Sequence, residues 1–233
     1  MNVPVMVDMK TMICIPIMAK NTDEALRMTI RATGLADVIE FRLDAMESLD
    51  LERMIRTTIR PVIITYRSKK EGGHGTANYE LQTRYLLEAI SIGVDYVDVE
   101  YGMPPQLRDT ILTKRGNTTI IVSTHLTYGT PSPAILEDTL QRLAATGADI
   151  AKIVTMARRP EDNLRMLDLV SSAKEAGIRV IAFCMGPLGR ISRIASPLLG
   201  GHLTFASLEE GLESADGQIP AREMKRIMEI LST

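Results

Sequence analysis

The segment "GADIAKIVTMA", residues 147–157, contains a turn, a strand and one unexpected charge. Gly147 is typical of a helix end, and the apolar residues Ile150, Ile153 and Val154 predict a buried strand after it. Lys152 lies in the middle of this strand. A buried ammonium group costs several kcal/mol unless it is paired or gives up its proton, so the lysine needs a polar environment inside the fold.

The same succession of a short apolar strand and an amphipathic helix repeats along the whole chain. Strands are predicted at residues 12–17, 37–43, 61–66, 94–100, 118–125, 149–154, 178–184 and 200–205. Helices are predicted at residues 22–33, 48–58, 77–92, 104–114, 132–146, 160–175, 189–196 and 219–231.

Capping residues mark several of these boundaries. Asn21 or Thr22 is expected to cap the first helix, since acidic residues follow in the first turn. Gly147 and Gly177 are expected as C-caps where two helices turn into strands. Pro160 suits the first turn of the sixth helix.

Eight strand–helix units in 233 residues, without a Pro/Gly/Ser-rich linker, favour one closed (β/α)8 barrel, a TIM barrel, in a single domain over residues 1–233. An open, doubly wound α/β sheet is the alternative. Such a sheet usually has a Gly-rich turn after its first strand, and "ICIPIMAKNTDEA", residues 13–25, contains no glycine.

The composition indicates which kinds of partner and which cellular compartment to expect. A formal net charge of −2 gives no indication of a nucleic-acid partner. Cys14 and Cys184 stand far apart and outside any metal-ligand spacing, which predicts reduced thiols in a cytosolic protein. No apolar run approaches the ~18 residues of a membrane span, and the N-terminus lacks the pattern of a signal peptide. We therefore expect a cytoplasmic protein without a membrane partner.

Charged residues inside the strands share one face of each strand, because side chains alternate between faces with a period of two. The opposite faces are apolar and must meet the helices, so the polar faces are expected to line the barrel interior. This interior set comprises Glu40, Arg42, Arg67, Asp98, Glu100, His125 and Lys152. One interior ion pair, such as Glu40 with Arg42, could merely seal the barrel. Charges on five strands favour a functional cavity, since interior ion networks gain little stability over apolar packing.

Lys152 and His125 are the candidates for chemistry in this cavity. A low dielectric and nearby arginines favour the neutral amine of Lys152, which would attack carbonyls and form Schiff bases. His125 is suited to moving protons near neutral pH, whereas His74 and His202 are weaker candidates. No HxH, HxxxH or CxxC pairing indicates a metal site.

Three loops at the predicted carboxyl ends of strands add polar groups. "RSKKEGGHGTANYE", residues 67–80, contains Glu71 and three glycines, as expected of a mobile flap or of a plain surface loop. "MGPLGRISRIASP", residues 185–197, offers Arg190 and Arg193 at a helix start, a pattern that fits an anion site or solvated arginines. In "SADGQIP", Ser214 and Gln218 are candidates for binding hydroxyl groups, or Ser214 shapes a turn.

These motifs together resemble one enzyme family. The chain is similar to type I 3-dehydroquinate dehydratase from about residue 12 to about residue 220, and its compact length resembles archaeal members. The motifs that carry the resemblance, in order, are "EFRLD", "YRSKKEGG", the strand-end His125, "KIVTMA", "MGPLGRISR" and "SADGQIP".

The resemblance implies a lyase of the shikimate pathway that dehydrates 3-dehydroquinate to 3-dehydroshikimate without metal or cofactor. Lys152 corresponds to the lysine that forms the imine with the substrate ketone. His125 corresponds to the general acid/base, and Glu71 to the carboxylate associated with it.

The resemblance also implies a substrate-binding set. Arg193 corresponds to the arginine that binds the substrate carboxylate. The other members of the set are Glu40, Arg42, Arg67, Ser214 and Gln218. The small-molecule substrate is the expected partner, and a homodimer is one assembly that the sequence leaves open. The chain departs from the family where Leu126-Thr127 follows the histidine and where Asp216 replaces a proline of the last loop.

Two other functions share parts of this pattern. A class I aldolase would also use Lys152 but would usually bind a phosphorylated substrate near the seventh and eighth strands. A non-catalytic barrel that binds carboxylates would have no need of a strand lysine. The pair of Glu40 with Arg42 and the presence of His125 favour the dehydratase.

Overall fold

The computed structural model describes residues 11–76 and 78–231, and within these ranges eight strands alternate with eight α-helices. The strands are β1 (Ile13–Ile17), β2 (Val38–Arg42), β3 (Val62–Thr65), β4 (Tyr96–Glu100), β5 (Thr119–Leu126), β6 (Ile150–Met156), β7 (Val180–Met185) and β8 (Thr204–Phe205). The helices are α1 (Thr22–Ala32), α2 (Leu51–Thr57), α3 (Tyr79–Ile92), α4 (Pro105–Thr113), α5 (Pro133–Ala144), α6 (Asp162–Glu175), α7 (Arg190–Leu199) and α8 (Ala221–Leu231). Short 3-10 helices follow three strands: η1 (Leu43–Ala45), η2 (Lys69–Glu71) and η3 (Pro187–Gly189).

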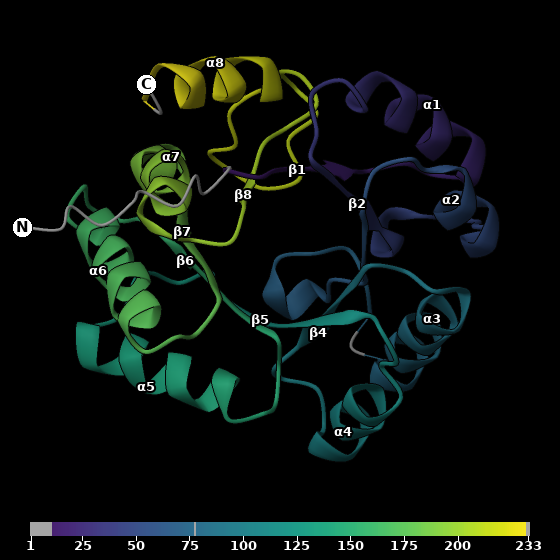
Figure 1. Cartoon of the computed structure of the whole chain (residues 1–233), viewed down its shortest axis with the longest axis horizontal. Coiled ribbons are helices and arrows are strands. Elements are labelled where there is room, and N and C mark those ends of the chain that lie inside the picture. Colours follow the sequence, from purple (N-terminus) through teal and green to yellow (C-terminus); the bar gives the residue numbers. More distant parts are fainter. Residues whose placement is uncertain (1–10, 77, 232–233) are drawn as a thin grey trace, which may run out of the picture.

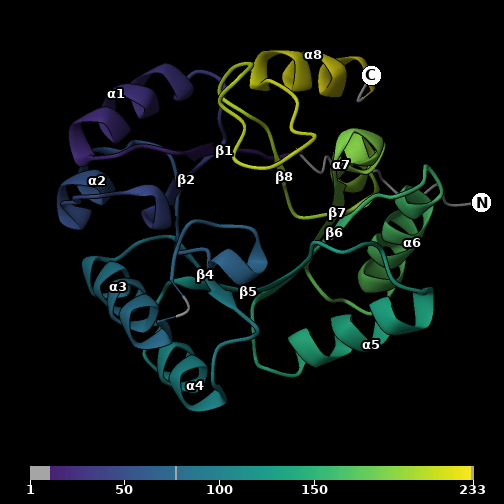
Figure 2. The same ribbon diagram turned by 180° about the vertical axis from the view of Figure 1, so that it is seen from behind.

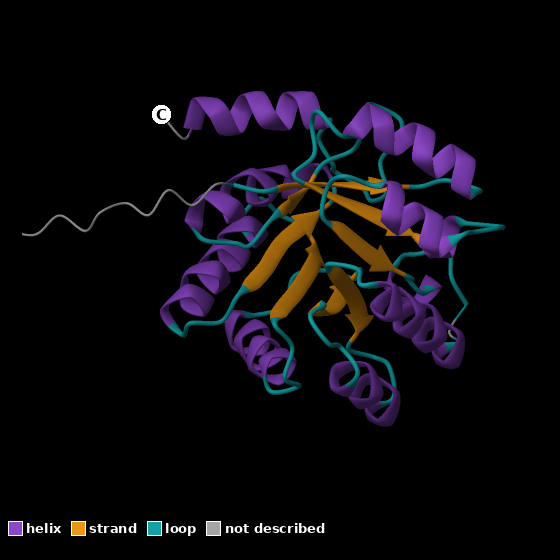
Figure 3. Cartoon of the chain, turned by 45° about the vertical axis from the view of Figure 1, so that its right-hand side comes forward, coloured by secondary structure: helices purple, strands orange, loops and turns teal. Residues whose placement is uncertain are grey.

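All strand pairings in the described residues are parallel, and the strands follow the order β7-β6-β5-β4-β3-β2-β1-β8. The seam between β7 and β8 is bridged by a 2.7 Å hydrogen bond from the backbone N–H of His202 to the carbonyl of Val180. The helices form a ring around the strands (Figures 1, 2 and 3). The predicted (β/α)8 barrel is therefore confirmed, and the open sheet is excluded.

The interior of the barrel changes from apolar to polar along the strand direction. The bottom of the interior is apolar, and the side chains that pack there include Cys14, Val38, Ile63, Ile121, Ile150, Ile181 and Leu203. Two residues further along the strands the interior positions are Glu40, Thr65, Asp98, Ser123, Lys152, Phe183 and Phe205. Arg42, Arg67, Glu100 and His125 follow near the carboxyl ends. The polar groups therefore lie between this apolar layer and the carboxyl ends of the strands.

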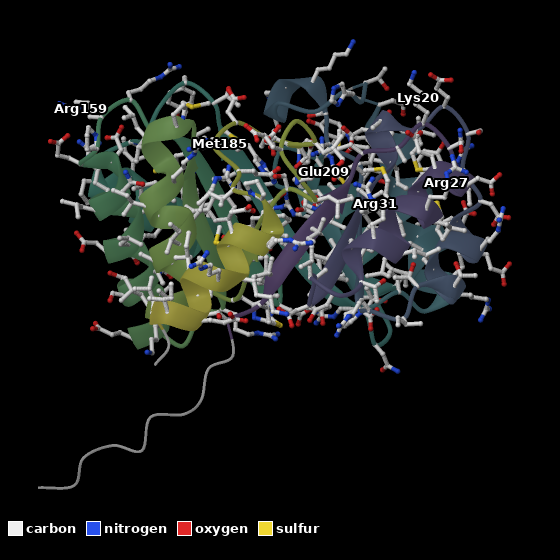
Figure 4. The ribbon with its side chains drawn as sticks, turned by 90° about the horizontal axis from the view of Figure 1, so that it is seen from above. Lys20, Arg27, Arg31, Arg159, Met185 and Glu209 are labelled. Atoms are coloured by element: carbon white, nitrogen blue, oxygen red, sulfur yellow. The ribbon has the colours of Figure 1, made fainter. Side chains whose placement is uncertain are left out.

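The opposite faces of the strands pack against the helices, as the period of two requires. Ile15, Ile39, Ile64, Val97 and Ile153 belong to this outer core and are almost fully buried. An ion pair between Arg31 on α1 and Glu209 in the loop after β8 joins two neighbouring units at the surface (Figure 4). Polar strand faces inside and apolar faces outside are the arrangement that the sequence predicted.

The predicted helix starts are close to those observed. Asn21 caps α1, because its side chain accepts a 3.0 Å hydrogen bond from the N–H of Glu24. Pro160 lies just before α6, which starts at Asp162, so its predicted place in the first turn is wrong by two residues. Position 77, the predicted start of the third helix, lies outside the described residues.

The two glycines predicted as C-caps lie just beyond the cap residues. Ala145 and Ala176 are the caps of α5 and α6. Gly147 and Gly177 follow them with φ of 84° and 70°. A left-handed backbone is easily adopted by glycine, so these residues still reverse the chain into the next strand, as expected.

Helix α7 continues three residues beyond its predicted end at residue 196, although Pro197 lies inside it. A proline cannot donate to the carbonyl four residues earlier, which belongs to Arg193. That carbonyl accepts a 2.7 Å hydrogen bond from the hydroxyl of Thr204 on β8 instead. The last residue of the helix is Leu199, and Gly200 is its C-cap. Strand β8 begins at Thr204 rather than at residue 200.

Among the described residues, no helix has the length and apolar character needed to span a bilayer. The predicted absence of a signal peptide concerns residues 1–10, which lie outside the described ranges, and the prediction of one domain over residues 1–233 also includes them.

Candidate active site

A cavity opens at the carboxyl ends of the strands, the end where barrel enzymes place their sites. Seven of its lining residues were predicted from the sequence: Glu40, Arg42, Arg67, Lys152, Arg193, Ser214 and Gln218. The remaining wall is mostly apolar and comprises Thr65, Val154, Phe183, Met185, Phe205 and Ala215. The cavity therefore combines charged groups from β2, β3 and β6 with an apolar side formed by β7 and β8.

Lys152 lies on the interior face of β6 with only 4% of its surface exposed. Its Nζ donates a 2.8 Å hydrogen bond to Asp98 Oδ2 and lies 3.9 Å from Glu40 Oε1. The ring centroid of Phe205 is 4.4 Å from the same nitrogen. Pairing with Asp98 therefore answers the question that a lysine in a buried strand raises.

Asp98 is the centre of the buried charge network. Its Oδ1 accepts hydrogen bonds from Arg67 at 2.7 Å and from the hydroxyl of Ser123 at 2.5 Å. Burial opposes ionisation, but Arg67 and then Lys152 outweigh it and hold the pKa of the Asp98 carboxyl well below its usual range. Asp98 was assigned to the cavity from its strand face but was not predicted as a site residue.

Arg67 stands just beyond the end of β3 and contacts three carboxylates. It lies 2.7 Å from Asp98, 3.0 Å from Glu71 and 3.3 Å from Glu100. These anions raise the pKa of its guanidinium against the opposing effect of burial, so the charge is permanent. Arg67 was predicted to bind substrate; it lines the cavity, and most of its visible contacts hold other side chains in place.

His125, near the end of β5, forms a 3.0 Å hydrogen bond through Nδ1 with Glu71 Oε2. Burial, together with the cations Arg67 and Lys152, lowers the pKa of His125 well below its ordinary value. Burial also raises the pKa of Glu71 to about 7, although Arg67 opposes this. The structure thus brings together the histidine and the carboxylate that the resemblance paired.

Glu71 is held over the mouth of the barrel by the segment that follows β3. This segment contains η2 and lies over the middle of the ring of elements (Figures 1 and 2). A backbone bridge joins Ser68 to Gly75. A Cβ at Gly73 would lie 2.2 Å from the Arg67 carbonyl oxygen, and one at Gly75 would lie 2.3 Å from the Tyr66 ring. Close packing thus explains two of the three glycines that indicated a flap or surface loop.

Arg42 and Asp44, both from the "EFRLD" motif, form a bidentate pair with two contacts of 2.8 Å. Asp44 also accepts hydrogen bonds from the backbone N–H groups of Arg67 and His74, at 3.1 and 3.0 Å. The carboxylate therefore orients Arg42 and ties down both ends of the loop that carries Glu71. Asp44 was not predicted as a site residue, although it follows Arg42 by two residues in the "EFRLD" motif.

Arg193 is 1% exposed and lies in the first turn of α7. It donates a 3.1 Å hydrogen bond to the backbone carbonyl of Asp216, and its Nε has no hydrogen-bond partner among the described residues. Burial lowers the pKa of its guanidinium to about 10, although Cys184 and Asp216 oppose this. Such a cation at a cavity wall fits an anionic ligand, whereas Arg190 on the same helix is exposed.

Ser214 and Gln218 face the cavity from the loop between β8 and α8, and they bind each other. The Gln218 amide oxygen accepts from the Ser214 N–H at 2.8 Å, and its nitrogen contacts the Ser214 hydroxyl at 3.1 Å. The carbonyl of Asp216 also accepts from the N–H of Gly186 at 3.0 Å. Because residue 216 acts through its carbonyl, which a proline would also provide, the departure from the family pattern leaves this contact in place.

The other two histidines lie away from these groups. The side chain of His74 is 65% exposed, with Nδ1 3.7 Å from Asp44. His202 lies at the bottom of the barrel beside the ring of Tyr96, and burial lowers its pKa to about 4. Within the described ranges, no group of three or more His, Cys, Asp or Glu side chains could hold a metal ion.

Comparisons with known proteins agree with this geometry. The family model for type I 3-dehydroquinase matches residues 13–233. A 3-dehydroquinate dehydratase of Methanosarcina acetivorans is 36% identical over 207 residues, which cover 84% of this chain and 86% of that protein. The similarity to a methanogen protein fits the archaeal resemblance.

Two further matches extend the comparison. The chloroplastic bifunctional 3-dehydroquinate dehydratase/shikimate dehydrogenase of Arabidopsis thaliana is 35% identical over 220 residues, and the match covers 92% of this chain but only 36% of that protein. The solved type I 3-dehydroquinate dehydratase of Clostridium difficile, with covalently modified comenic acid, superposes with a TM-score of 0.86 at 27% identity. That superposition covers 95% of this chain and 92% of the solved one. On the family match, the identities and the shared barrel, the chain belongs to the type I 3-dehydroquinase family.

Proposed function

We propose that this protein is a 3-dehydroquinate dehydratase, a lyase that converts 3-dehydroquinate to 3-dehydroshikimate in the shikimate pathway through a Schiff base on Lys152. Membership of the type I family supports the overall reaction. The buried Lys152 in the cavity and the His125–Glu71 pair near the end of β5 support the Schiff-base route.

Binding places the ketone of the substrate near the lysine. The substrate carboxylate pairs with Arg193, whose Nε has no hydrogen-bond partner among the described residues. The hydroxyl groups are bound by the polar residues of the predicted set, which are Glu40, Arg42, Arg67, Ser214 and Gln218. The apolar wall with Phe183, Met185 and Phe205 packs against the face of the ring.

Imine formation begins when Lys152 loses a proton and its amine attacks the ketone carbon. The C–N bond forms, and His125 moves this proton and then a second proton of the same nitrogen to the departing oxygen, which leaves as water. The resulting iminium is a stronger electron sink than the ketone and therefore acidifies the adjacent C2 hydrogen.

Elimination then proceeds through the same histidine. His125 takes the C2 proton, the C–H electrons move toward the iminium, and the C1 hydroxyl leaves as water after receiving a proton from His125. Hydrolysis of the imine releases a conjugated enone and restores Lys152. Glu71 holds His125 by the 3.0 Å hydrogen bond to Nδ1, which directs Nε2 to the substrate.

The observation that carries this proposal is a buried lysine in a cavity that also contains Arg193, a buried arginine whose Nε has no hydrogen-bond partner among the described residues. Incubation with 3-dehydroquinate, followed by the ultraviolet absorbance of the enone, tests it directly. We expect the absorbance to rise with wild-type protein and to stay flat with Lys152→Ala of unchanged circular dichroism. A flat trace with the folded wild-type protein would contradict the proposal.

The competing functions give different outcomes in the same test. A class I aldolase would form a Schiff base with Lys152 but would act on other carbonyl substrates and leave 3-dehydroquinate unchanged. A carboxylate-binding barrel would bind the substrate without turnover. The His125–Glu71 pair favours the dehydratase over both, since a proton shuttle is needed for elimination.

The same proposal includes cytoplasmic action on a small-molecule substrate, independent of metal and cofactor. Two buried free thiols, Cys14 and Cys184, are consistent with a reducing compartment. A homodimer stays a prediction, and sedimentation equilibrium of the full chain measures it.

A further inference from the structure

Asp98 and Glu100 are buried carboxylates on the interior face of β4, and they have different partners. Asp98 accepts a hydrogen bond from Lys152 Nζ at 2.8 Å. Glu100 accepts from Arg67 at 3.3 Å and from the backbone N–H of Ser68 at 2.7 Å. The two acids therefore provide a natural comparison between a carboxylate that touches the reactive nitrogen and one that supports the surrounding loop.

The Asp98 carboxylate is fixed in position. Its side chain is 0% exposed, and Oδ1 is occupied by Arg67 at 2.7 Å and by Ser123 at 2.5 Å. These donors come from β5 and from the end of β3, so they hold the carboxylate from two neighbouring strands. Oδ2 is thereby directed at Lys152, 2.8 Å away.

The charge on the Lys152 nitrogen is the same before and after imine formation. An ammonium and a ketone give an iminium and water: one C–N double bond forms, the C–O double bond breaks, and two ammonium protons leave with the oxygen. The ammonium that forms the salt bridge with Asp98 and the iminium that would replace it carry the same positive charge. An anion fixed at this position needs no rearrangement as the reaction proceeds.

We propose that Asp98 is the counter-ion of the Lys152 nitrogen throughout the reaction, and that it keeps the imine protonated during removal of the C2 proton. This inference rests on the Schiff-base function proposed above. Because a neutral imine withdraws electrons less strongly than an iminium, loss of the counter-ion would slow chemistry more than binding. The Phe205 ring, 4.4 Å from Nζ, assists as a weaker partner of the same cation.

A purely structural role is the alternative, in which Asp98 serves only to neutralise Arg67. Glu71 and Glu100 also contact Arg67, at 3.0 and 3.3 Å, so Arg67 keeps two anionic partners when Asp98 is replaced. A structural role would thus change stability or binding and would leave the protonation of Lys152 as it is. The two roles therefore predict different pH dependences for the chemical modification of Lys152, which can be measured on the protein without substrate.

The experiment compares Asp98→Asn with Glu100→Gln, each of which removes one buried carboxylate bonded to Arg67. For Asp98→Asn we expect kcat to fall about 10²-fold, as when an electrostatic contact to the reacting centre is removed, with little change in KM. The pH midpoint for inactivation by an amine-selective reagent at Lys152 should shift about 1–3 pH units lower, since the nearer of its two anionic partners is gone and only Glu40, at 3.9 Å, stays. For Glu100→Gln the midpoint should equal that of the wild type.

Equal midpoints in the two variants, or an unchanged midpoint in Asp98→Asn, would overturn the inference. If circular dichroism shows that Asp98→Asn does not fold, Arg67→Gln/Asp98→Asn is compared with Arg67→Gln alone, because removing both members of a buried ion pair is better tolerated. The double variant should have the lower midpoint, and equal midpoints would again overturn the inference. Labelling needs no substrate, so failure of the proposed function appears separately, as a wild type that leaves 3-dehydroquinate unchanged.

Discussion

His125 and Glu71 share a 3.0 Å hydrogen bond, which couples the protonation of the two side chains. Burial lowers the pKa of His125 well below its usual value, so the imidazole is neutral at physiological pH. When Glu71 is ionised it accepts the Nδ1 proton, and the lone pair of Nε2 is free to act as the base. When Glu71 is protonated it can donate to Nδ1 instead, which moves the imidazole proton to Nε2 and blocks the base.

This coupling predicts the acid limb of the pH profile. Burial raises the pKa of Glu71 to about 7, so kcat/KM should fall as the pH drops below about 7 and the carboxylate takes up a proton. Glu71→Gln should lower kcat at all pH values and remove this limb, because the amide does not titrate. Initial rates from pH 5 to 9 are measured for the wild type and for Glu71→Gln. A limb near pH 7 that persists in Glu71→Gln would assign the titration to another group.

His125→Ala should separate imine formation from turnover. Lys152 remains and can still attack the ketone slowly, but C2 proton removal and imine hydrolysis lose their shuttle. General acid–base groups contribute about 10²–10⁴-fold, and a residue that serves several steps should lie at the upper end of that range. Intact mass spectrometry without reductant should therefore show a stable adduct in this variant. Thr127→Ala, just beyond β5, serves as the control and should turn over normally.

Near wild-type kcat in His125→Ala would mean that another group is the base. Glu71, 3.0 Å from the imidazole, would be the next residue to test.

Arg193→Ala should chiefly raise KM, because the substrate carboxylate is present in both the ground state and the transition state. A charge-assisted contact of this kind contributes about 1.5–3 kcal/mol, or roughly 10- to 150-fold in affinity. Arg190→Ala is the matched control, since this arginine lies in the same turn of α7 but is exposed. Steady-state kinetics of both variants decide the point. A collapse of kcat at unchanged KM would remove Arg193 from the role of carboxylate ligand.

At the scale of the elements, periodicity and capping predicted every strand and helix to within a few residues, because each pattern reports on its own local segment. The predicted boundaries are wrong where a contact with a residue distant in the sequence sets the end of an element. Helix α7 runs past its predicted end because Thr204 satisfies the carbonyl that Pro197 leaves without a donor. The 3-10 helices η1 and η2 lie in the loops that Asp44 ties together, a contact that no local pattern reveals.

The loop between β8 and α8 offers a test of how an element positions the site. Gly217 has φ of 79°, and a Cβ there would lie 2.2 Å from the carbonyl oxygen of Gly186. Gly217→Ala should therefore displace the loop that carries Ser214 and Gln218, and raise KM.

Gly211→Ala is the control for this loop substitution. Gly211 has a similar φ of 83°, but a Cβ at that position would meet nothing within 4 Å. Both variants should lose about 1 kcal/mol of stability from the strained backbone, measured by denaturant unfolding. The rise in KM should appear in Gly217→Ala alone, and a similar rise in Gly211→Ala would show that backbone strain, not the contact, controls binding.

At the scale of the whole molecule, the barrel and the inward direction of its charged side chains could be predicted, because both follow from strand periodicity and the βα rhythm. The ion pairs inside the cavity could not be predicted from the sequence. Lys152 and Asp98 are separated by 54 positions in the chain, and Asp98 also binds Arg67, 31 positions away. Which carboxylate meets which cation depends on strand register and rotamer, and these are set only when the barrel is assembled.

The proposed Schiff base would form on the nitrogen of Lys152, above the apolar bottom of the barrel. The most direct test is reduction with borohydride in the presence of 3-dehydroquinate, followed by peptide mass spectrometry. We expect loss of activity together with a single modified peptide that carries the reduced adduct on Lys152. A modification at another lysine, or an active and unmodified protein after treatment, would contradict it.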